Sequence, residues 1–332
     1  MHTRLSWRIE LLLASLLLSS PPANAQTSEA KKEVKGVLKA SFRAFANAYN
    51  QKLTAQPRLL TNLQDRRINE SSGLAYSTYN RDVLWTHNDS GDDAFVFAID
   101  RKGRTLARYK VLGAKNIDWE DIATGQGANG RPALYILDGG DNNKRRDDTT
   151  LYRVEEPLVD TSKTMQERAT AVCEAFPFRY PDRHHDCETL LIHSKTGETL
   201  IVTKEDDGRS GVYAFPNPLH PNQQVTLKKV GEIVFSNVYL RGDTVFAKGE
   251  RMATGGSVSF DGTRVIIRTY TRAFEWTVKP GQTLAEALKG ESRVQRIPLT
   301  IQGESICYSP DGKSLFATSE RLPTPLYETP IK

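Results

Sequence analysis

The chain has 332 residues, of which 38% are hydrophobic, and its formal net charge is +5 at pH 7. This length is sufficient for one large domain or two ordinary ones with a substantial core. Its lysines and arginines are scattered and form no stripe interleaved with aromatic residues, which argues against a nucleic-acid-binding protein.

The first residues have the features of a secretory signal peptide. Arg4 and Arg8 precede the apolar run LLLASLLL, and the small residues Ala23 and Ala25 fit a cleavage site before Gln26. No second stretch of about 18 apolar residues follows, so we expect no transmembrane segment. The sequence therefore predicts export to the periplasm or the extracellular space.

The segment from Lys31 to Ala55 has a helical pattern. Its apolar residues, from Val34 to Tyr49, recur at steps of three and four and so share one face. We expect an amphipathic helix packed on the main domain. The alternative is a helix that binds a protein partner or a membrane surface through this face.

After Pro57 the sequence indicates strands and turns in a repeating order. Five segments each contain a short apolar strand, a second strand and a third strand with an aromatic residue at a matching place. These aromatic residues are Phe97, Tyr152, Tyr213, Phe274 and Tyr327. A fourth, more polar strand follows four times. Four strands per unit, repeated radially, are typical of an all-β protein of the β-propeller class.

Five blades are the expected number. The last unit lacks its fourth strand, and the unpaired PRLLTNLQ before the first unit can supply it and close the ring. The segment NVYLRGDTVFAKG is either an insertion or a degenerate sixth blade. The predicted division is a signal peptide at 1–25, a helical arm at 26–56 and a β-propeller at 57–332.

Polar residues are predicted to gather at one mouth of the central channel, where the first strand of each blade begins and the second ends. At the beginnings stand Glu70, Glu120, Glu188 and Glu304, and Gly256 interrupts the series. Like charges at close range repel unless a cation offsets them, and Ca²⁺ or another divalent cation suits a ring of oxygen ligands. These glutamates are the candidate metal ligands. The alternative is that they cap backbone amides at a repeated structural corner.

The ends of the second strands supply further candidates. Those proposed to bind a ligand are Asn88, Asp89, Asp138, Asp141, Asn142, Glu205 and Arg321. If the protein is an enzyme, Lys204 and Arg268 would hold an anionic substrate and His87 would move a proton.

Three cysteines suit an exported protein with at most one disulfide. Cys173 and Cys187 enclose a short loop and are the candidate pair, but spacing alone leaves open whether they are bonded. Cys307 is expected to be a buried free thiol.

Several segments together resemble a group of exported bacterial β-propellers without an assigned reaction. They are NESSGLAYS, LWTHNDSGDD, NIDWEDIA, LYILDGGDN, DCETLLIHSKTGETLIVTKE and GESICYSPDGKSLFATSE. More distantly, the pattern is similar to phytase-like, esterase-like and gluconolactonase-like propellers. That resemblance implies acidic side chains holding a divalent ion at the channel mouth, with Glu70, Glu120, Glu188 and Glu304 in that role. Gly256 departs from the pattern.

The preferred hypothesis is an exported, monomeric binding protein with an acidic, cation-binding channel mouth and an extracellular or envelope ligand. Neither G-x-S-x-G nor H-E-x-x-H occurs in the sequence, which favours binding over catalysis. The alternative is a metal-dependent hydrolase of phosphoesters, carboxylic esters or lactones. A third hypothesis is display of the N-terminal helix to a protein partner.

Overall fold

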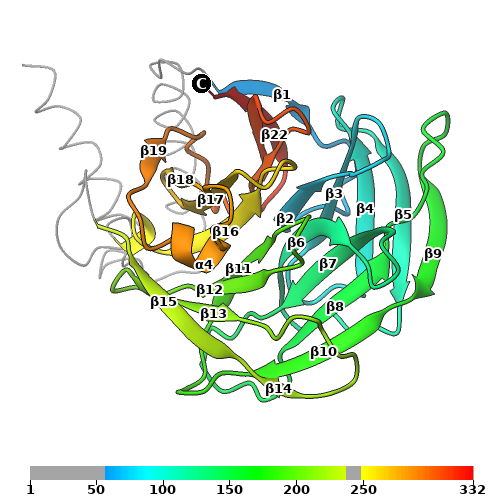
Figure 1. Ribbon diagram of the computed structural model, residues 1–332. Helices are drawn as coiled ribbons and strands as arrows, with labels where there is room; N and C mark the ends of the chain where they lie inside the picture. The colour runs from blue at the N-terminus through cyan, green and yellow to red at the C-terminus, as the bar shows by residue number, and fades with distance from the viewer. Residues whose placement is uncertain (1–56, 237–247, 332) are drawn as a thin grey trace, which may run out of the picture.

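The computed structural model describes residues 57–236 and 248–331, which form strands β1 to β22 in five sheets around a central axis (Figure 1). This arrangement confirms the predicted five-bladed β-propeller. The predicted signal peptide, the helical arm and most of NVYLRGDTVFAKG lie outside the described residues.

Blades 1 and 2 each have five strands. Blade 1 consists, in spatial order, of β2 (Ser71–Tyr76), β3 (Val83–Asn88), β4 (Phe95–Asp100), β5 (Thr105–Leu112) and β9 (Gln166–Val172). Blade 2 consists of β6 (Trp119–Gln126), β7 (Pro132–Asp138), β8 (Thr150–Glu155), β10 (Glu174–Arg179) and β14 (Val225–Thr226). The outermost strands, β9 and β14, pair in parallel and come from the connections of the following blade. They are additions to the four strands that the sequence pattern predicts.

Blades 3, 4 and 5 each have four strands. Blade 3 consists of β11 (Cys187–Ile192), β12 (Thr199–Thr203), β13 (Arg209–Ala214) and β15 (Lys228–Val234). Blade 4 consists of β16 (Ala253–Val258), β17 (Arg264–Thr269), β18 (Ala273–Thr277) and β19 (Arg293–Gln295). Blade 5 consists of β20 (Cys307–Tyr308), β21 (Ser314–Ala317), β22 (Pro325–Pro330) and β1 (Arg58–Asn62).

The ring is closed by β1, as predicted. This strand pairs antiparallel with β22, with Leu59 opposite Tyr327, so that the first and last described strands lie side by side (Figure 1). The closure pairs an edge of blade 5 that would otherwise be open.

The inner strands are buried on both faces because each blade packs against two neighbours. All six residues of β3 are buried, and so are all six of β2 and of β11. Within blade 1, the rings of Trp85 and Tyr109 meet edge to face at 5.7 Å, and Trp119 of blade 2 belongs to the same cluster. Such aromatic contacts add to the area that the cluster buries.

Helix is scarce in the described ranges. The short helix α4 (Leu284–Ala287) begins after Thr283, whose hydroxyl accepts a hydrogen bond from the Glu286 N–H in a capping box. No helix in residues 57–236 and 248–331 has the length and hydropathy needed to span a membrane.

All three cysteines are unpaired, so the candidate Cys173–Cys187 disulfide is not formed. Cys187 begins the innermost strand of blade 3, whereas Cys173 lies between β9 and β10 in the outer part of the sheets. The loop that looks short in sequence therefore spans most of the width of a blade.

The first strands β2, β6, β11, β16 and β20 contact one another around the axis. Each pairs antiparallel with the second strand of its blade, so the beginnings of the first strands and the ends of the second strands lie on one face. This geometry brings the residues that flank those strand ends to one mouth of the channel.

Candidate metal centre at the channel mouth

Seven acidic side chains lie at this face and are called the acidic mouth here. They stand just before or at the start of β6, β11 and β20, or follow β3 and β21: Asp89, Asp118, Glu120, Asp186, Glu188, Glu304 and Glu320. Within the mouth, two groups of three carboxylates have the spacing of a metal site, and both include Glu120.

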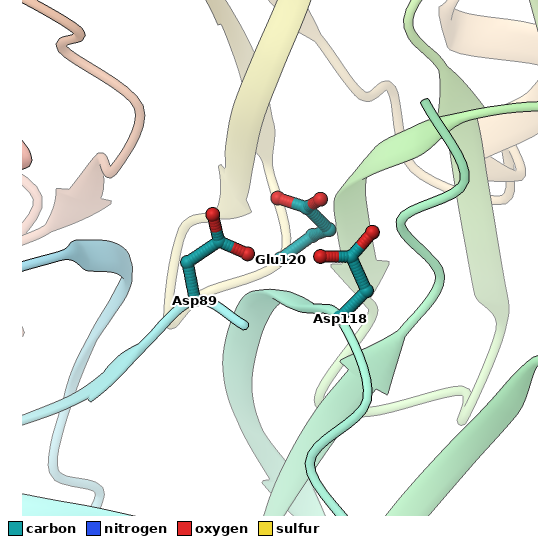
Figure 2. Close-up of side chains that lie close together, drawn as sticks. All are labelled: Asp89, Asp118 and Glu120. Atoms are coloured by element: carbon teal, nitrogen blue, oxygen red, sulfur yellow. The ribbon is translucent and has the colours of Figure 1, made fainter. Parts of the chain in front are cut away.

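The first group, triad 1, consists of Asp89, Asp118 and Glu120. Their carboxylate oxygens lie within 4.8 Å of one another, and Figure 2 shows the three carboxylates close together. Glu120 is buried, whereas Asp89 and Asp118 are only half-buried. Triad 1 is therefore anchored in the protein and open to solvent at its two aspartates.

Hydrogen bonds to the backbone position the two aspartates. The N–H of Asp118 donates to Asp138 Oδ1 at 3.1 Å, and the Asp138 carboxylate is ion-paired with Arg146 at 2.7 Å. The carbonyl of Asp89 accepts a hydrogen bond from the Asn116 side chain at 2.6 Å. Because these partners are part of the fold, the backbone at both aspartates is held in place without any ion.

Gly140, which follows β7, makes room for triad 1. A Cβ at this position would lie 2.5 Å from Asp118 Oδ2 and would collide with Glu120 Oε1. Only glycine permits the backbone to pass this close to the two carboxylates. The second glycine of LDGGDN thus has a steric role at the site.

The second group, triad 2, consists of Glu120, Asp186 and Glu188, all of them buried. Asp186 Oδ1 accepts a hydrogen bond from the Asp141 N–H at 2.9 Å. The ammonium of Lys204 contacts Glu188 Oε1 and lies 5.5 Å from the centre of the Tyr270 ring. Lys204 therefore offsets part of the negative charge of triad 2.

Glu304 and Glu320 form the remaining edge of the mouth. The Tyr270 hydroxyl donates to Glu304 Oε1 at 2.9 Å, and the Gln302 amide donates to Glu320 Oε2 at 2.5 Å. Neutral donors satisfy part of this edge, so it depends less on a cation than the triads do.

Burial and mutual repulsion raise the pKa values of the mouth carboxylates. Burial, followed by the charges of Asp118 and Glu304, raises the pKa of Asp89 to about 8. Burial, Glu188 and Asp89 hold the pKa of Glu120 well above its usual range. Burial also raises the pKa of Glu188 well above normal, although Lys204 opposes it. Ionising the whole cluster is thus unfavourable unless a cation offsets the charge.

The lysine beside triad 2 stays charged. Burial alone would lower the pKa of Lys204, but the charges of Glu188, Tyr270 and Glu304 outweigh this effect and raise it well above normal. Lys204 is therefore charged at neutral pH, and Glu188 is the carboxylate that interacts with it most strongly.

Three buried carboxylate oxygens accept no hydrogen bond within the described part of the chain. They are Asp89 Oδ1, Glu188 Oε2 and Glu304 Oε2. Buried charged oxygens ordinarily have partners, and leaving one without costs free energy. Carboxylate oxygens are the ligands that hard divalent cations prefer, so this set fits the cation that the sequence pattern suggested.

Five of the predicted site residues lie at the acidic mouth or directly beside it: Asp89, Glu120, Glu188, Lys204 and Glu304. Asp89 was predicted to bind a ligand, and it lies in triad 1, whose carboxylate spacing fits a metal ion. The two remaining carboxylates of the triads, Asp118 and Asp186, were not predicted.

His87 and Arg268 are not brought to the mouth as free groups. The fully buried His87 ring bonds to the Asn88 carbonyl at 2.9 Å and packs edge-on against Trp119 at 5.6 Å. Its burial lowers its pKa to about 4, so it is neutral near pH 7. Arg268 is also fully buried, and its Nη1 donates to the Ser305 carbonyl at 2.8 Å. Both side chains contribute to packing between blades.

Three candidate ligand residues have structural partners instead. Asn88 accepts hydrogen bonds from the N–H groups of residues 69 and 70, and Asp138 and Asp141 accept them from residues 118 and 146. The three side chains therefore satisfy backbone N–H groups at the ends of the second strands.

The other three candidates lie away from the triads. Glu205 binds Lys144, Arg183 and His185, at 2.7, 3.2 and 2.7 Å. Asn142 and Arg321 are exposed.

The predicted alignment of the units on their glutamates is wrong by two residues in blade 1. In each of blades 1, 2 and 3, one residue of the first strand pairs with the last residue of the second strand. These pairs are Ser71 with Asn88, Trp119 with Asp138, and Cys187 with Thr203, so Ser71, Trp119 and Cys187 are equivalent. Ser72 is therefore the counterpart of Glu120 and Glu188, and Glu70 corresponds to Asp118 and Asp186. Glu70 is partly exposed and belongs to neither triad.

In blade 4, the corresponding position is Thr254 rather than Gly256, because Ala253 pairs with Thr269. A signal for the two missed residues was present in the sequence. Each of the segments DWE and DCE carries an acidic residue two positions before its glutamate.

No family model matches the chain, and no curated protein matches it. Among solved structures, the chain is similar to XC5397 from Xanthomonas campestris, described as a gluconolactonase important in glucose secondary metabolic pathways. The similarity covers 83% of this chain and 90% of that chain, with 13% sequence identity and a TM-score of 0.43. A similarity this distant carries no information about the activity of the present chain.

Proposed function

We propose that the protein is a binding protein that holds a divalent cation at triad 1 and presents it to a ligand at the channel mouth. The observation that carries this proposal is the convergence of Asp89, Asp118 and Glu120 within 4.8 Å. Asp89 Oδ1 is buried and accepts no hydrogen bond from a nitrogen or hydroxyl group in the described part of the chain. This supports the proposal, because a cation would supply that contact.

The composition of triad 1 favours Ca²⁺. Calcium takes about six to eight oxygen ligands, and three carboxylates supply only part of that number. Since Asp89 and Asp118 are half-buried, solvent or a ligand can fill the remaining positions from the outer face. The ion would thus link the propeller to whatever the mouth binds.

The charge of the mouth narrows the class of ligand. The nearby cations are Arg146, Lys204 and Arg268, fewer than the seven carboxylates of the mouth. Arg146 is paired with Asp138, Lys204 is paired with Glu188, and Arg268 is fully buried, so none of these cations is free to bind an anion. The suitable ligands are neutral or cationic and offer hydroxyl or carbonyl oxygens to the ion.

The hydrolase alternative has less support. His87 and Arg268 are fully buried in the packing, and Lys204 is engaged with Glu188. An acidic mouth also disfavours phosphoesters, which are anionic. Neutral esters and lactones agree with the charge, but none of the three residues predicted for catalysis stands free beside triad 1.

Thermal unfolding of the chelator-stripped protein during a calcium titration tests the proposal. A cation that binds only the folded state stabilises it by about 2.7 kcal/mol at 100 times its Kd. We expect calcium to raise the melting temperature of the wild type and to have little effect on Asp118→Asn or Glu120→Gln.

Glu70→Gln is the matched control, because Glu70 is an acidic residue on the same side of its blade but outside both triads. It should respond to calcium as the wild type does. If no divalent ion moves the melting temperature of the wild type, the proposal is wrong.

We also propose that the protein acts outside the cytoplasm. The basic and apolar pattern of residues 1–25 supports this proposal. Mass spectrometry of the protein purified from its native cell envelope or medium should find Gln26 at the N-terminus. An N-terminus at Met1 would contradict export through this segment.

A further inference from the structure

The two triads differ in whether a cation of the protein directly contacts one of their carboxylates. They share Glu120, and their carboxylate spacing is alike. The Lys204 ammonium contacts Glu188 of triad 2 directly. In the described residues no ion pair joins a cation to a carboxylate of triad 1, although Arg146 and Lys204 act on Asp118 from a greater distance. The carboxylates of both triads repel one another. In triad 2 a lysine of the protein offsets this repulsion by direct contact, and in triad 1 no such contact is present in the described residues.

Lys204 is held firmly beside triad 2. Its side chain is only 11% exposed, and its Nζ lies 5.5 Å from the centre of the Tyr270 ring. An ammonium is a compact charge that can donate to several oxygens at once, so it can stand where a metal ion would otherwise bind.

Glu188 shows that the lysine satisfies triad 2 incompletely. Glu188 Oε1 contacts Lys204, but its Oε2 is buried and accepts no hydrogen bond. The side chain of Glu188 is 3% exposed, so water does not compensate for this oxygen from the surface. Triad 2 thus retains an oxygen that a divalent ion would engage.

We infer that Lys204 is a built-in substitute for a second metal ion, which limits the mouth to one divalent cation. The inference rests on the proposed function, because it takes triad 1 to be the occupied site. Removing the ammonium leaves buried carboxylates without their counter-charge, which is strongly unfavourable. A second divalent ion, bridged to the first by Glu120, would restore the balance.

The test is the number of ions bound by the full chain. Isothermal titration of the chelator-stripped protein with Ca²⁺ should give one site in the wild type and two in Lys204→Met, whose side chain has similar length but no charge. Lys204→Arg, which keeps the charge, should still bind one ion. Lys204→Met combined with Asp186→Asn should return to one, because the second substitution removes a ligand of triad 2.

Manganese provides a second readout. Ions that share a bridging carboxylate lie about 4 Å apart, as in two-metal sites, and interact magnetically. Electron paramagnetic resonance should therefore show isolated Mn²⁺ in the wild type and a coupled pair in Lys204→Met. Circular dichroism checks that each variant is folded. If Lys204→Met does not fold, Lys204→Gln takes its place with the same expected count.

The outcomes separate the two proposals. One ion in the wild type and one in the folded Lys204 variant would overturn this inference and leave the proposed function intact. Two ions in the wild type would also overturn it, because Lys204 would then not prevent a second ion from binding. No ion in any of the proteins would overturn the proposed function, and this inference with it.

Discussion

The carboxylate of Asp121 in blade 2 accepts a hydrogen bond from the N–H of Leu190 in blade 3, at 2.9 Å. The same oxygen receives the N–H of Gly256 in blade 4 at 3.3 Å, and the other receives that of Ile122 at 2.9 Å. Asp121 is fully buried and directly follows Glu120 of the acidic mouth in β6. One side chain therefore joins the innermost strands of three blades.

Replacing Asp121 with Ala should destabilise the propeller. Three buried N–H groups would lose their acceptor, and each unsatisfied buried group costs about 1–3 kcal/mol. We expect the free energy of unfolding to fall by about 3 kcal/mol or more, measured by urea denaturation. Asp93→Ala is the control, because the exposed Asp93 has only a 3.9 Å contact with Lys110 and should change stability by less than about 0.5 kcal/mol. Equal effects of the two substitutions would contradict the role of Asp121.

Gly140→Ala should abolish calcium binding while leaving most of the fold intact. The added methyl group would occupy the space of the Asp118 and Glu120 carboxylates and push them apart. Gly127→Ala, in the same blade, places its methyl no closer than 3.4 Å to any neighbour and should bind calcium as the wild type does. Calorimetric titration of both variants gives the comparison. Normal calcium affinity in Gly140→Ala would mean that triad 1 is not the binding site.

The contribution of Asp89 to the stability of the calcium-free protein should fall as the pH rises from about 4 to about 8. Folding raises the pKa of Asp89 from its usual 3.8 to about 8, so the folded state binds more protons than the unfolded state in this interval. The stabilisation is complete below the unfolded pKa and is lost as the pH passes through the folded pKa. Asp89→Asn keeps the shape of the side chain and removes its ionisation. The change in melting temperature from pH 5 to pH 8 should therefore be less negative, or more positive, in Asp89→Asn than in the wild type. An equal or more negative change in Asp89→Asn would be inconsistent with this pKa.

His87→Ala should affect stability and not calcium binding. The substitution removes a fully buried ring that packs against Trp119, and deletions of large buried side chains cost about 3 kcal/mol. We expect a lower urea midpoint and a calcium affinity within about twofold of the wild type. A large loss of affinity with unchanged stability would instead place His87 in the binding machinery.

The sequence predicts the fold well because each blade repeats the same physical pattern. Buried strands and an aromatic residue in the third strand recur in every unit, and the unpaired PRLLTNLQ before the first unit can close the ring. The added strands β9 and β14 were missed. They belong in sequence to one blade and in space to another, and local periodicity carries no information on such exchanges.

The candidate site is predicted only in part, because identical residue types were aligned without regard to strand register. Glu120 and Glu188 occupy equivalent positions, but Glu70 stands where Asp118 and Asp186 stand in the next two blades. Irregular pairing where these strands begin makes the offset hard to detect from spacing. The roles of His87 and Arg268 depended on side-chain direction, which strand ends alone do not determine.

The most direct test of the account is an anomalous diffraction measurement on crystals grown with Mn²⁺. We predict a single strong peak between Asp89, Asp118 and Glu120, at about 2.2 Å from an oxygen of each, as hard cations bind carboxylates. A structure that contains the three ordered carboxylates and shows no peak among them at saturating Mn²⁺ would contradict the account.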